Sequence, residues 1–464
     1  MIRKNGMIEN DNALEERLRT LVSKGITIID PRQTYISPEV NLDRIYSGCV
    51  LYPGTRLTGE KTLIGSFAKV GSEGPATIHD SMLGSDTEVA SGFLSEATLL
   101  PGARAGSNCH FRAGTLLEEN VFTGHSVGLK QSILMYSVVT GSLINFCDTL
   151  ISGGRSRSDH SEVGSGFIHF NFTPWGKRGD KATPSLIGNV TEGVFLDKDR
   201  IFLGGLSGIV GPQTVGFGSI TVAGQVIREA VADSTMHSET GVRFVRDLLP
   251  TKVKFSKNRL NGILNKNIEY IAQLTALKCW YSQVRLERSR AKKDMALFLV
   301  LMGAIETIQI CITERIRRYN SFAEEWSLPQ IDETLFLWNE ESAQPDNSAK
   351  WNVNAASEKV NAAGEKVNGA GERVNTTGEK VNDAGERVNA AGEKVNGASE
   401  KANGARRLAG VTVRDAFPNG KIDWKLELAY DEWIWGLAEE EKQALRLWLN
   451  ECAEGAADAA KSRK

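Results

Sequence analysis

Cysteine is scarce in this sequence, and the few cysteines present are scattered. There are six, with no Cys-x-x-Cys pair and no histidine at zinc-finger spacing: Cys49, Cys109, Cys147, Cys279, Cys311 and Cys452. This distribution argues against a disulfide framework and against a structural zinc site. We therefore expect reduced thiols and a cytoplasmic protein.

The sequence also has no excess of one charge, and we expect neither a secretion signal nor a membrane span. Its 55 basic and 57 acidic residues give a formal net charge of −2, so nucleic acid is not an expected partner. Acidic residues and asparagines stand where a signal peptide would be apolar. The apolar stretch from Ala296 to Ile312 is short for a span and contains Glu306 and Gln309, which favours a buried or trimer-facing helix.

A six-residue repeat is what the sequence does contain. Aliphatic residues recur at every sixth position in two stretches: Ile45, Leu51, Leu57, Leu63 and Leu203, Ile209, Val215. In such a repeat each hexapeptide forms one short strand and a corner, and the aliphatic side chain points into a prism of stacked coils. The pattern predicts a β-solenoid over residues 35–231, which needs a different element to cap its end.

Other segments flank this predicted solenoid. Residues 1–34 contain a short amphipathic helix and a lead-in. Residues 232–342 have long runs without proline and almost without glycine, which predict two or three α-helices. Residues 409–464 combine tryptophans with leucine and glutamate, which predicts a small Trp-rich helical module.

Residues 343–408 contain a heptad repeat. Valine recurs at every seventh position from Val353 to Val395, in units of the form VNxxGEK. A helix would place valine and a small residue on a thin coiled-coil seam. The glycine found in most units costs a helix about 1 kcal/mol relative to alanine, so we expect a flexible or partly helical spacer, with the coiled coil as the alternative.

The central part of the chain resembles a family of acyltransferases. The similarity is carried by FRAGTLLEENVFTGHSVGLKQSILMYSVVTGSLINFCD, Phe111 to Asp148, and extends from Gly25 to Gly224. This stretch resembles the acetyltransferase half of the bifunctional N-acetylglucosamine-1-phosphate uridylyltransferase/glucosamine-1-phosphate acetyltransferase. The resemblance implies a left-handed parallel β-helix, acyl-CoA (acetyl-CoA above all) as co-substrate, no metal in the β-helix, and a homotrimer with sites between subunits. It also implies a nucleotide sugar or sugar phosphate as substrate, within UDP-N-acetylglucosamine-related metabolism.

Two cations match the phosphate-binding Arg and Lys of that family. They are Arg112 and Lys130, which are eighteen residues, or one full coil, apart and so should stack along one edge. Two cations placed in this way can grip a diphosphate. The alternative is that both line a solvated edge.

Other site positions follow from the same resemblance. Asn171 matches an Asn that contacts the acyl-CoA and sugar region, and Ala223 matches an acyl-CoA contact. Gly205 stands where the family has a cofactor-binding Ser, and Lys177 matches a substrate-binding Lys.

Lys177 and Lys181 belong to a basic, glycine-containing segment, His169 to Ser185, that is unlike the standard acetyltransferase. It resembles a branch of bacterial proteins related to UDP-N-acetylglucosamine pyrophosphorylase. Exposed amides and cations of such a segment can surround a phosphate. Alternatively, the segment packs against a neighbouring subunit.

The general base of the family is replaced in this chain. Ser142 stands in the place of the catalytic His, and Asn145 in the place of a substrate-binding Tyr. Acyl transfer needs a base because the attacking amine or hydroxyl loses a proton, and Ser cannot serve in that way near neutral pH. His160, in an inserted segment, and His169 are the candidate catalytic replacements, although a lone His is more often a packing or surface residue.

Two functions therefore stay open. The first is an acyl-CoA-dependent transferase of the hexapeptide-repeat type acting on a nucleotide sugar or sugar phosphate. The second is a non-catalytic trimeric scaffold that binds a nucleotide sugar and recruits a protein partner through residues 409–464. No segment resembles the uridylyltransferase half, so we do not expect that activity from this sequence.

Overall fold

The chain divides into two units, and all of the residues that the structure describes belong to the first. The computed structural model describes residues 3–170, 183–239, 257–336 and 424–461. One unit comprises residues 1–344 with 407–464, and the other comprises residues 345–406. The predicted heptad-repeat spacer, 343–408, lies outside the described residues.

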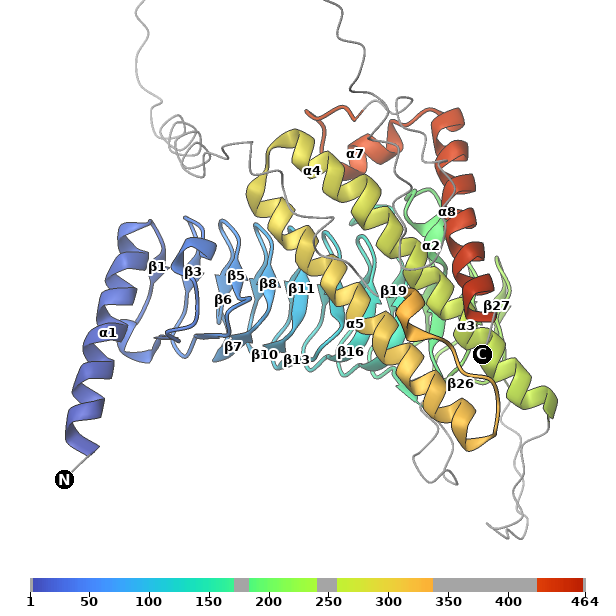
Figure 1. The fold of residues 1–464 in the computed structure, drawn as a ribbon, viewed down its shortest axis with the longest axis horizontal. Helices are drawn as coiled ribbons and strands as arrows, with labels where there is room; N and C mark the ends of the chain where they lie inside the picture. The colour runs from blue at the N-terminus through green and yellow to red at the C-terminus, as the bar shows by residue number, and fades with distance from the viewer. Residues whose placement is uncertain (1–2, 171–182, 240–256, 337–423, 462–464) are drawn as a thin grey trace, which may run out of the picture. The chain divides into compact units, whose positions relative to one another are not determined.

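A left-handed parallel β-helix follows an N-terminal helix, α1 (Arg3–Ser23), and confirms the predicted fold class (Figure 1). Its short strands stack in parallel and form three columns, which are the faces of a prism. Column one contains β1 (Thr27–Ile28), β3 (Val50–Leu51), β6 (Lys69–Val70), β9 (Glu88–Val89), β12 (Arg104–Ala105), β15 (Phe122–Thr123), β17 (Val139–Thr140), β19 (Glu162–Val163), β22 (Phe202–Leu203), β25 (Ile220–Thr221) and β27 (Met236–His237).

Columns two and three form one continuous sheet in the described residues, because two long strands bend around the corner between them. Column two contains β2 (Tyr35–Ile36), β4 (Arg56–Thr58), β7 (Ala76–His79), β10 (Gly92–Ser95), β13 (Cys109–Phe111), the first parts of β16 (Gly128–Leu134) and β18 (Asn145–Ile151), β20 (Ile168–Phe170), β23 (Gly208–Val210) and β26 (Val226–Ile227). Column three contains β5 (Leu63–Ile64), β8 (Met82–Leu83), β11 (Ala97–Leu99), β14 (Thr115–Leu117), the second parts of β16 and β18, β21 (Ser185–Ile187) and β24 (Thr214–Val215).

Column three is apolar on both of its faces, unlike the other two columns. Leu117 and Ile151 point into the prism, whereas their neighbours Leu116 and Leu150 point outward, and all four are fully buried or nearly so. Successive residues of a strand face opposite sides, so a strand with apolar residues at consecutive positions is covered on both sides. The outer cover is a set of helices from the C-terminal half of the chain.

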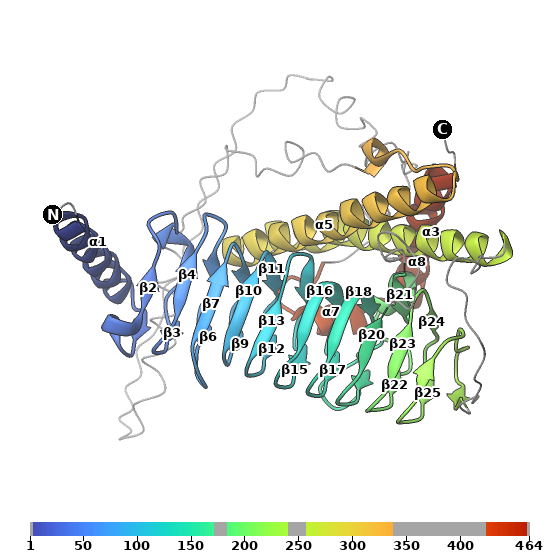
Figure 2. The same cartoon turned by 90° about the horizontal axis from the view of Figure 1, so that it is seen from below.

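The covering helices form an antiparallel pair along column three (Figure 2). α3 (Lys257–Trp280) continues through a π-helical turn (Tyr281–Arg285) into α4 (Leu286–Lys292). The chain then reverses, and Asp294 caps α5 (Met295–Glu325) by accepting a hydrogen bond from the Leu297 N–H. Among the described helices, α5 is long and apolar enough to span a membrane, but it packs on β8, β11, β14 and β16, and most of its apolar residues are buried. The predicted helices of residues 232–342 thus cover a side of the solenoid.

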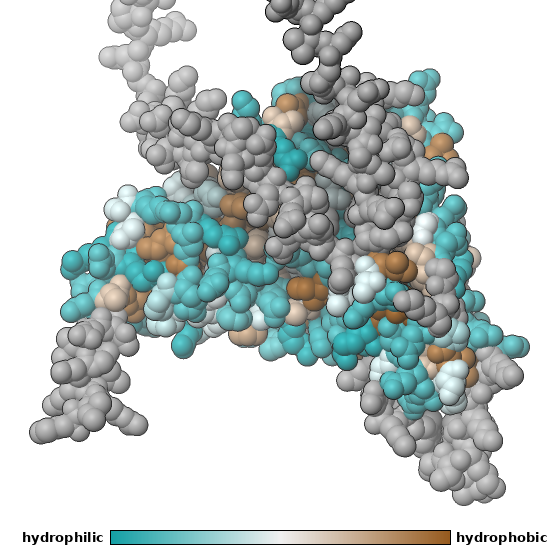
Figure 3. Space-filling model, in the orientation of Figure 1, coloured by the Kyte–Doolittle hydropathy of each residue, from teal (hydrophilic) through white to brown (hydrophobic). Residues whose placement is uncertain are grey.

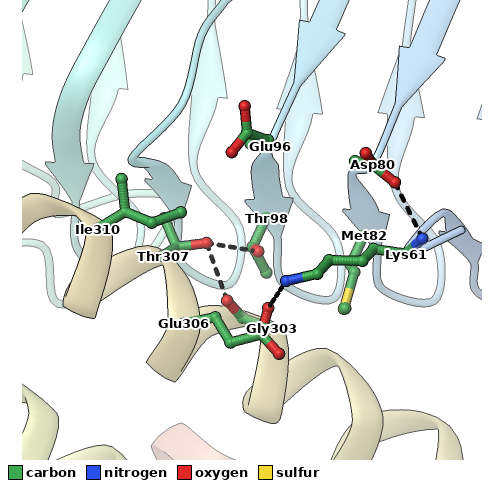
Figure 4. Close-up of a pocket in the computed structure, with 9 residues that line it drawn as sticks. All are labelled: Lys61, Asp80, Met82, Glu96, Thr98, Gly303, Glu306, Thr307 and Ile310. Carbon is green, nitrogen blue, oxygen red and sulfur yellow. Dashed lines mark hydrogen bonds and ion pairs between the residues drawn. The ribbon is translucent and has the colours of Figure 1, made fainter. Parts of the chain in front are cut away.

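Polar contacts fix α5 to the early coils (Figure 4). Lys61 Nζ lies 2.8 Å from Glu306 Oε2, and the hydroxyls of Thr98 and Thr307 lie 2.9 Å apart. A side chain at Gly303 would bring its Cβ within 2.2 Å of Met82 Sδ. Glycine at this position therefore sets how closely α5 approaches the sheet.

The Trp-rich terminus forms α7 (Tyr430–Trp435) and α8 (Glu439–Lys461), and α8 packs on α3 and on the short α2 (Val190–Gly193). Trp433 and Trp448 are almost completely buried against these helices. Figure 3 shows a face of the molecule that is mostly hydrophilic, with scattered hydrophobic residues. This agrees with two large apolar clusters, one inside the prism and one under the helices.

A buried ionic cluster joins the solenoid, the π-helical turn and the terminal module. Arg285 contacts Glu119, lies 3.6 Å from Glu118 Oε1, and donates a 2.8 Å hydrogen bond to the Tyr281 hydroxyl. Its guanidinium also lies 4.3 Å from the centre of the Tyr430 ring. Because these residues come from three distant segments, the cluster fixes how the segments pack.

Candidate functional site

Arg112 and Lys130 lie on the edge between columns two and three. β13 and β16 pair in register with Phe111 opposite Leu129, which puts Arg112 next to Lys130 in the following coil. Lys130 in turn pairs with Cys147 of β18, and the Arg112 guanidinium lies 3.9 Å from the Cys147 sulfur. Arg112 is exposed and Lys130 is half-buried, so both can reach an anion from solvent.

A third cation reaches this edge from α5. Arg318 Nη1 lies 2.8 Å from Asp148 Oδ2, and Arg315 Nη2 lies 2.6 Å from the other oxygen of the same carboxylate. Burial and Asp148 raise the pKa of the Cys147 thiol, whereas Arg112, Arg318 and Lys130 oppose the rise. Sequence reasoning missed Arg318, which lies 170 positions from Asp148 in a segment with no hexapeptide register.

The chain enters the basic segment at the same edge. β20 ends at Phe170, and its pairing with β18 places Phe170 beside Cys147 in the next coil. Asn171, Lys177 and Lys181 lie outside the described residues, so their predicted substrate contacts stay predictions.

His160 lies on a different edge, between columns three and one. Its Nδ1–H donates a 2.9 Å hydrogen bond to the Arg157 carbonyl oxygen, and its Nε2 lies 4.0 Å from Glu162 Oε2. Within one chain the fold does not bring His160 to Arg112 or Lys130. A site that uses all three would need residues of a second copy.

His169 is buried in β20 rather than exposed. Its Nε2 lies 2.9 Å from the Ser185 hydroxyl, and only 5% of the residue is exposed. Burial lowers the pKa of His169 to about 4, with Asp148 opposing this change, so the ring is neutral at pH 7. This environment is that of a packed histidine.

Gly205 and Ala223 lie on the third edge, between columns one and two. The Gly224 N–H donates a 2.9 Å hydrogen bond to the Gly205 carbonyl, so the two predicted cofactor positions stack in consecutive coils. The pairing of β17, β19, β22 and β25 puts Ser142, Ser165, Gly205 and Ala223 in equivalent places in four consecutive coils. Ser142 therefore shares its edge with the predicted cofactor contacts.

Ser142 contacts a histidine that sequence reasoning did not select. Its Oγ lies 2.7 Å from His125 Nδ1, one coil earlier on the same edge. The sequence signal is the spacing of seventeen residues, which is close to one coil. Among the described residues, no group of three or more His, Cys, Asp or Glu side chains could hold a metal ion.

These observations define a β-helix of the hexapeptide-repeat class with a cationic edge. No protein-family model matches the chain. It is 29% identical to the bifunctional protein GlmU of Shouchella clausii over 213 residues, which cover 46% of this chain and 41% of that protein. It is 28% identical to the bifunctional protein GlmU of Carboxydothermus hydrogenoformans over 220 residues (47% and 43%) and to that of Thermotoga maritima over 226 residues (47% and 44%). The chain spans less than half of the length of these curated relatives.

Proposed function

We propose that this protein is an acyl-CoA-dependent transferase acting on a nucleotide sugar or sugar phosphate of UDP-N-acetylglucosamine-related metabolism. The observation that carries the proposal is the edge where Arg112 and Lys130 stack and Arg318 approaches. The Arg112 guanidinium and the Lys130 ammonium can offset the charge of a phosphate or diphosphate, whereas Arg318 is paired with Asp148 and Glu314. The similarity to proteins named GlmU supports the same class, and acetyl-CoA is the expected acyl donor.

We further propose that three copies assemble through the C-terminal part of column one. The helices already cover column three. Near the C-terminal end of the solenoid, column one presents an exposed apolar ladder of Phe202, Ile220 and Met236, with Leu206 on the adjacent edge. An exposed apolar patch of this kind fits a protein interface, and a second copy would also bring its own edges to the site.

Cytoplasmic localisation is part of the same proposal. All six cysteines lie in the described residues and are free thiols, five of them buried. Unpaired thiols in these numbers suit a reducing compartment.

Ser142 is the observation that favours a scaffold instead of an enzyme, because the family places its base there. In that case the exposed Trp435 and Leu447 offer a partner surface on the terminal module, since Trp433 and Trp448 are occupied inside the fold. Thiol release from acetyl-CoA distinguishes the two functions.

Calorimetric titration of the full-length protein with UDP-N-acetylglucosamine tests the anion site. An Arg112→Ala/Lys130→Ala variant should bind at least about tenfold more weakly, since a charge-assisted hydrogen bond contributes about 1.5–3 kcal/mol. The matched control changes two exposed cations of column one, Lys69→Ala/Arg104→Ala, and should bind as the wild type does. Equal affinity in both double variants would contradict the proposed site.

A further inference from the structure

His125 and Ser142 occupy equivalent corners in consecutive coils. The residue that follows each, Ser126 and Leu143, has a positive φ (57° and 59°), which turns the chain from column one into column two. The Ser142 N–H donates a 3.0 Å hydrogen bond to the Ser165 hydroxyl, which fixes the Ser142 backbone. The repeated turn therefore brings the imidazole and the hydroxyl together on an open edge.

His125 is distinguished from the other histidines of the chain, all of which lie in the described residues. Its ring is exposed, and its Nδ1 lies 2.7 Å from a hydroxyl on the edge between columns one and two. The remaining rings bond or stack elsewhere: His79, His110, His160, His169 and His237. A proton acceptor for a bound substrate needs an accessible nitrogen, which His125 has.

An open strip of column two connects His125 with the cationic edge. His125 and Lys130 belong to the same coil and are separated by at most about 17 Å of chain. The outward residue between them is Gly128, which has no side chain, and Asn145 lies beside it in the next coil. An acceptor held through its phosphate at Lys130 can lie along this strip with its other end at His125.

The predicted cofactor contacts lie along the edge that carries His125. Ser142, Ser165, Gly205 and Ala223 follow one another at this corner in consecutive coils, as the pairing of the column-one strands requires. Adjacent coils are about 4.8 Å apart, so Ala223 is roughly 14 Å from Ser142 along the edge. A cofactor chain on this edge would bring its thioester toward the His125 ring.

We propose that His125 is the general base of the acyl transfer and that Ser142 positions its ring; this inference rests on the proposed function. The tautomer in which Nδ1–H donates to the Ser142 hydroxyl leaves Nε2 free to accept a proton. The acceptor's amine nitrogen adds to the thioester carbonyl carbon while Nε2 takes the amine proton. The C–S bond then breaks, and the CoA thiolate leaves with that proton.

Thiol release by the full-length protein, with acetyl-CoA and glucosamine 1-phosphate as probes, tests the assignment. His125→Ala should lower kcat at least about 100-fold, and the acidic limb of the pH–rate profile should disappear with it. Added imidazole should restore part of the rate, because the edge is open. Ser142→Ala should lower kcat less and keep the limb, since Ser142 acts only through His125. The control His79→Ala, a half-buried solenoid ring outside the site, should leave the rate unchanged.

Each contrary outcome has a separate meaning. A wild-type protein that binds UDP-N-acetylglucosamine but releases no thiol overturns acyl transfer, and His125 as its base with it. A wild-type protein that turns over while His125→Ala stays within threefold of it overturns only the base. An acetyl group found on Ser142 by mass spectrometry would make serine the nucleophile and would also overturn the inference.

Discussion

Removing the buried Arg285 should strongly destabilise the protein. Only 3% of its side chain is exposed, and it faces the carboxylates of Glu118 and Glu119, which are themselves 5% and 12% exposed. In Arg285→Met the apolar stem is kept and the charge is lost, which leaves two buried acids without their cation. Breaking a buried ion pair from one side costs about 3–5 kcal/mol, so we expect a loss of that size in the free energy of unfolding.

The loss should depend on pH in a defined direction. Burial raises the pKa of Glu118, and Arg285 opposes the rise, so the pKa should climb further in the variant. An acid whose pKa is higher in the folded state than in the unfolded state binds its proton more tightly when folded. The folded state therefore gains stability as the pH falls from the folded pKa toward the unfolded value of about 4.3. The difference between variant and wild type should shrink across this window.

Urea unfolding followed by circular dichroism and tryptophan fluorescence measures this effect, and coincident transitions would justify a two-state treatment. The matched control is Arg317→Met, because Arg317 pairs with Glu314 on the surface and its side chain is 64% exposed. An exposed pair contributes about 0–1 kcal/mol. An equal loss in the two variants, or a loss that grows as the pH falls, would refute the reasoning.

Three other outcomes are expected. Diamide should join Cys279 of α3 to Cys452 of α8, because both thiols are buried and the two helices pack on each other, and peptide mapping without reductant should find the disulfide; its absence would contradict the docking of α8. Leu150→Ala should cost about 2–5 kcal/mol in urea unfolding because Leu150 is buried under the helices, whereas Val139→Ala on column one should cost well under this amount. The folded pKa of His169 is depressed to about 4. The contribution of His169 to stability is therefore complete above its unfolded pKa of about 6.5 and is lost as the pH falls toward 4. In His169→Gln the free energy of unfolding should depend less steeply on pH over that range.

The solenoid was predictable because its repeat is local. Each hexapeptide specifies one strand and one corner, and the residues that satisfy it are neighbours in sequence. The cover on column three also left a signal, since Leu116–Leu117 and Leu150–Ile151 are apolar at consecutive positions, which marks a face buried on both sides. The packing of the terminal module left none, because its contacts join residues far apart, as Tyr136 and Asp431 do across 295 positions.

The candidate site was only partly predictable for a related reason. One coil of spacing predicted that Arg112 and Lys130 would be neighbours, and the structure places them on one edge. The same rule applied to Ser142 points to His125, seventeen positions earlier. His160 is a candidate because it lies in the inserted segment beside Ser142, and His169 because it lies two residues before Asn171. Arg318 belongs to a helix, where coil spacing has no meaning, so its approach to the edge required the folded structure.

The late cover on column three has a consequence for biosynthesis. The outward row that includes Leu116 and Leu150 is made early, but its partners in α5 end only at Glu325, roughly 175 residues later. At a synthesis rate of about 5–20 residues per second, this interval lasts roughly 10 to 35 seconds. During that time a stack of coils with one exposed apolar face emerges from the ribosome. The nascent chain is therefore a natural client for a chaperone until α5 has been made.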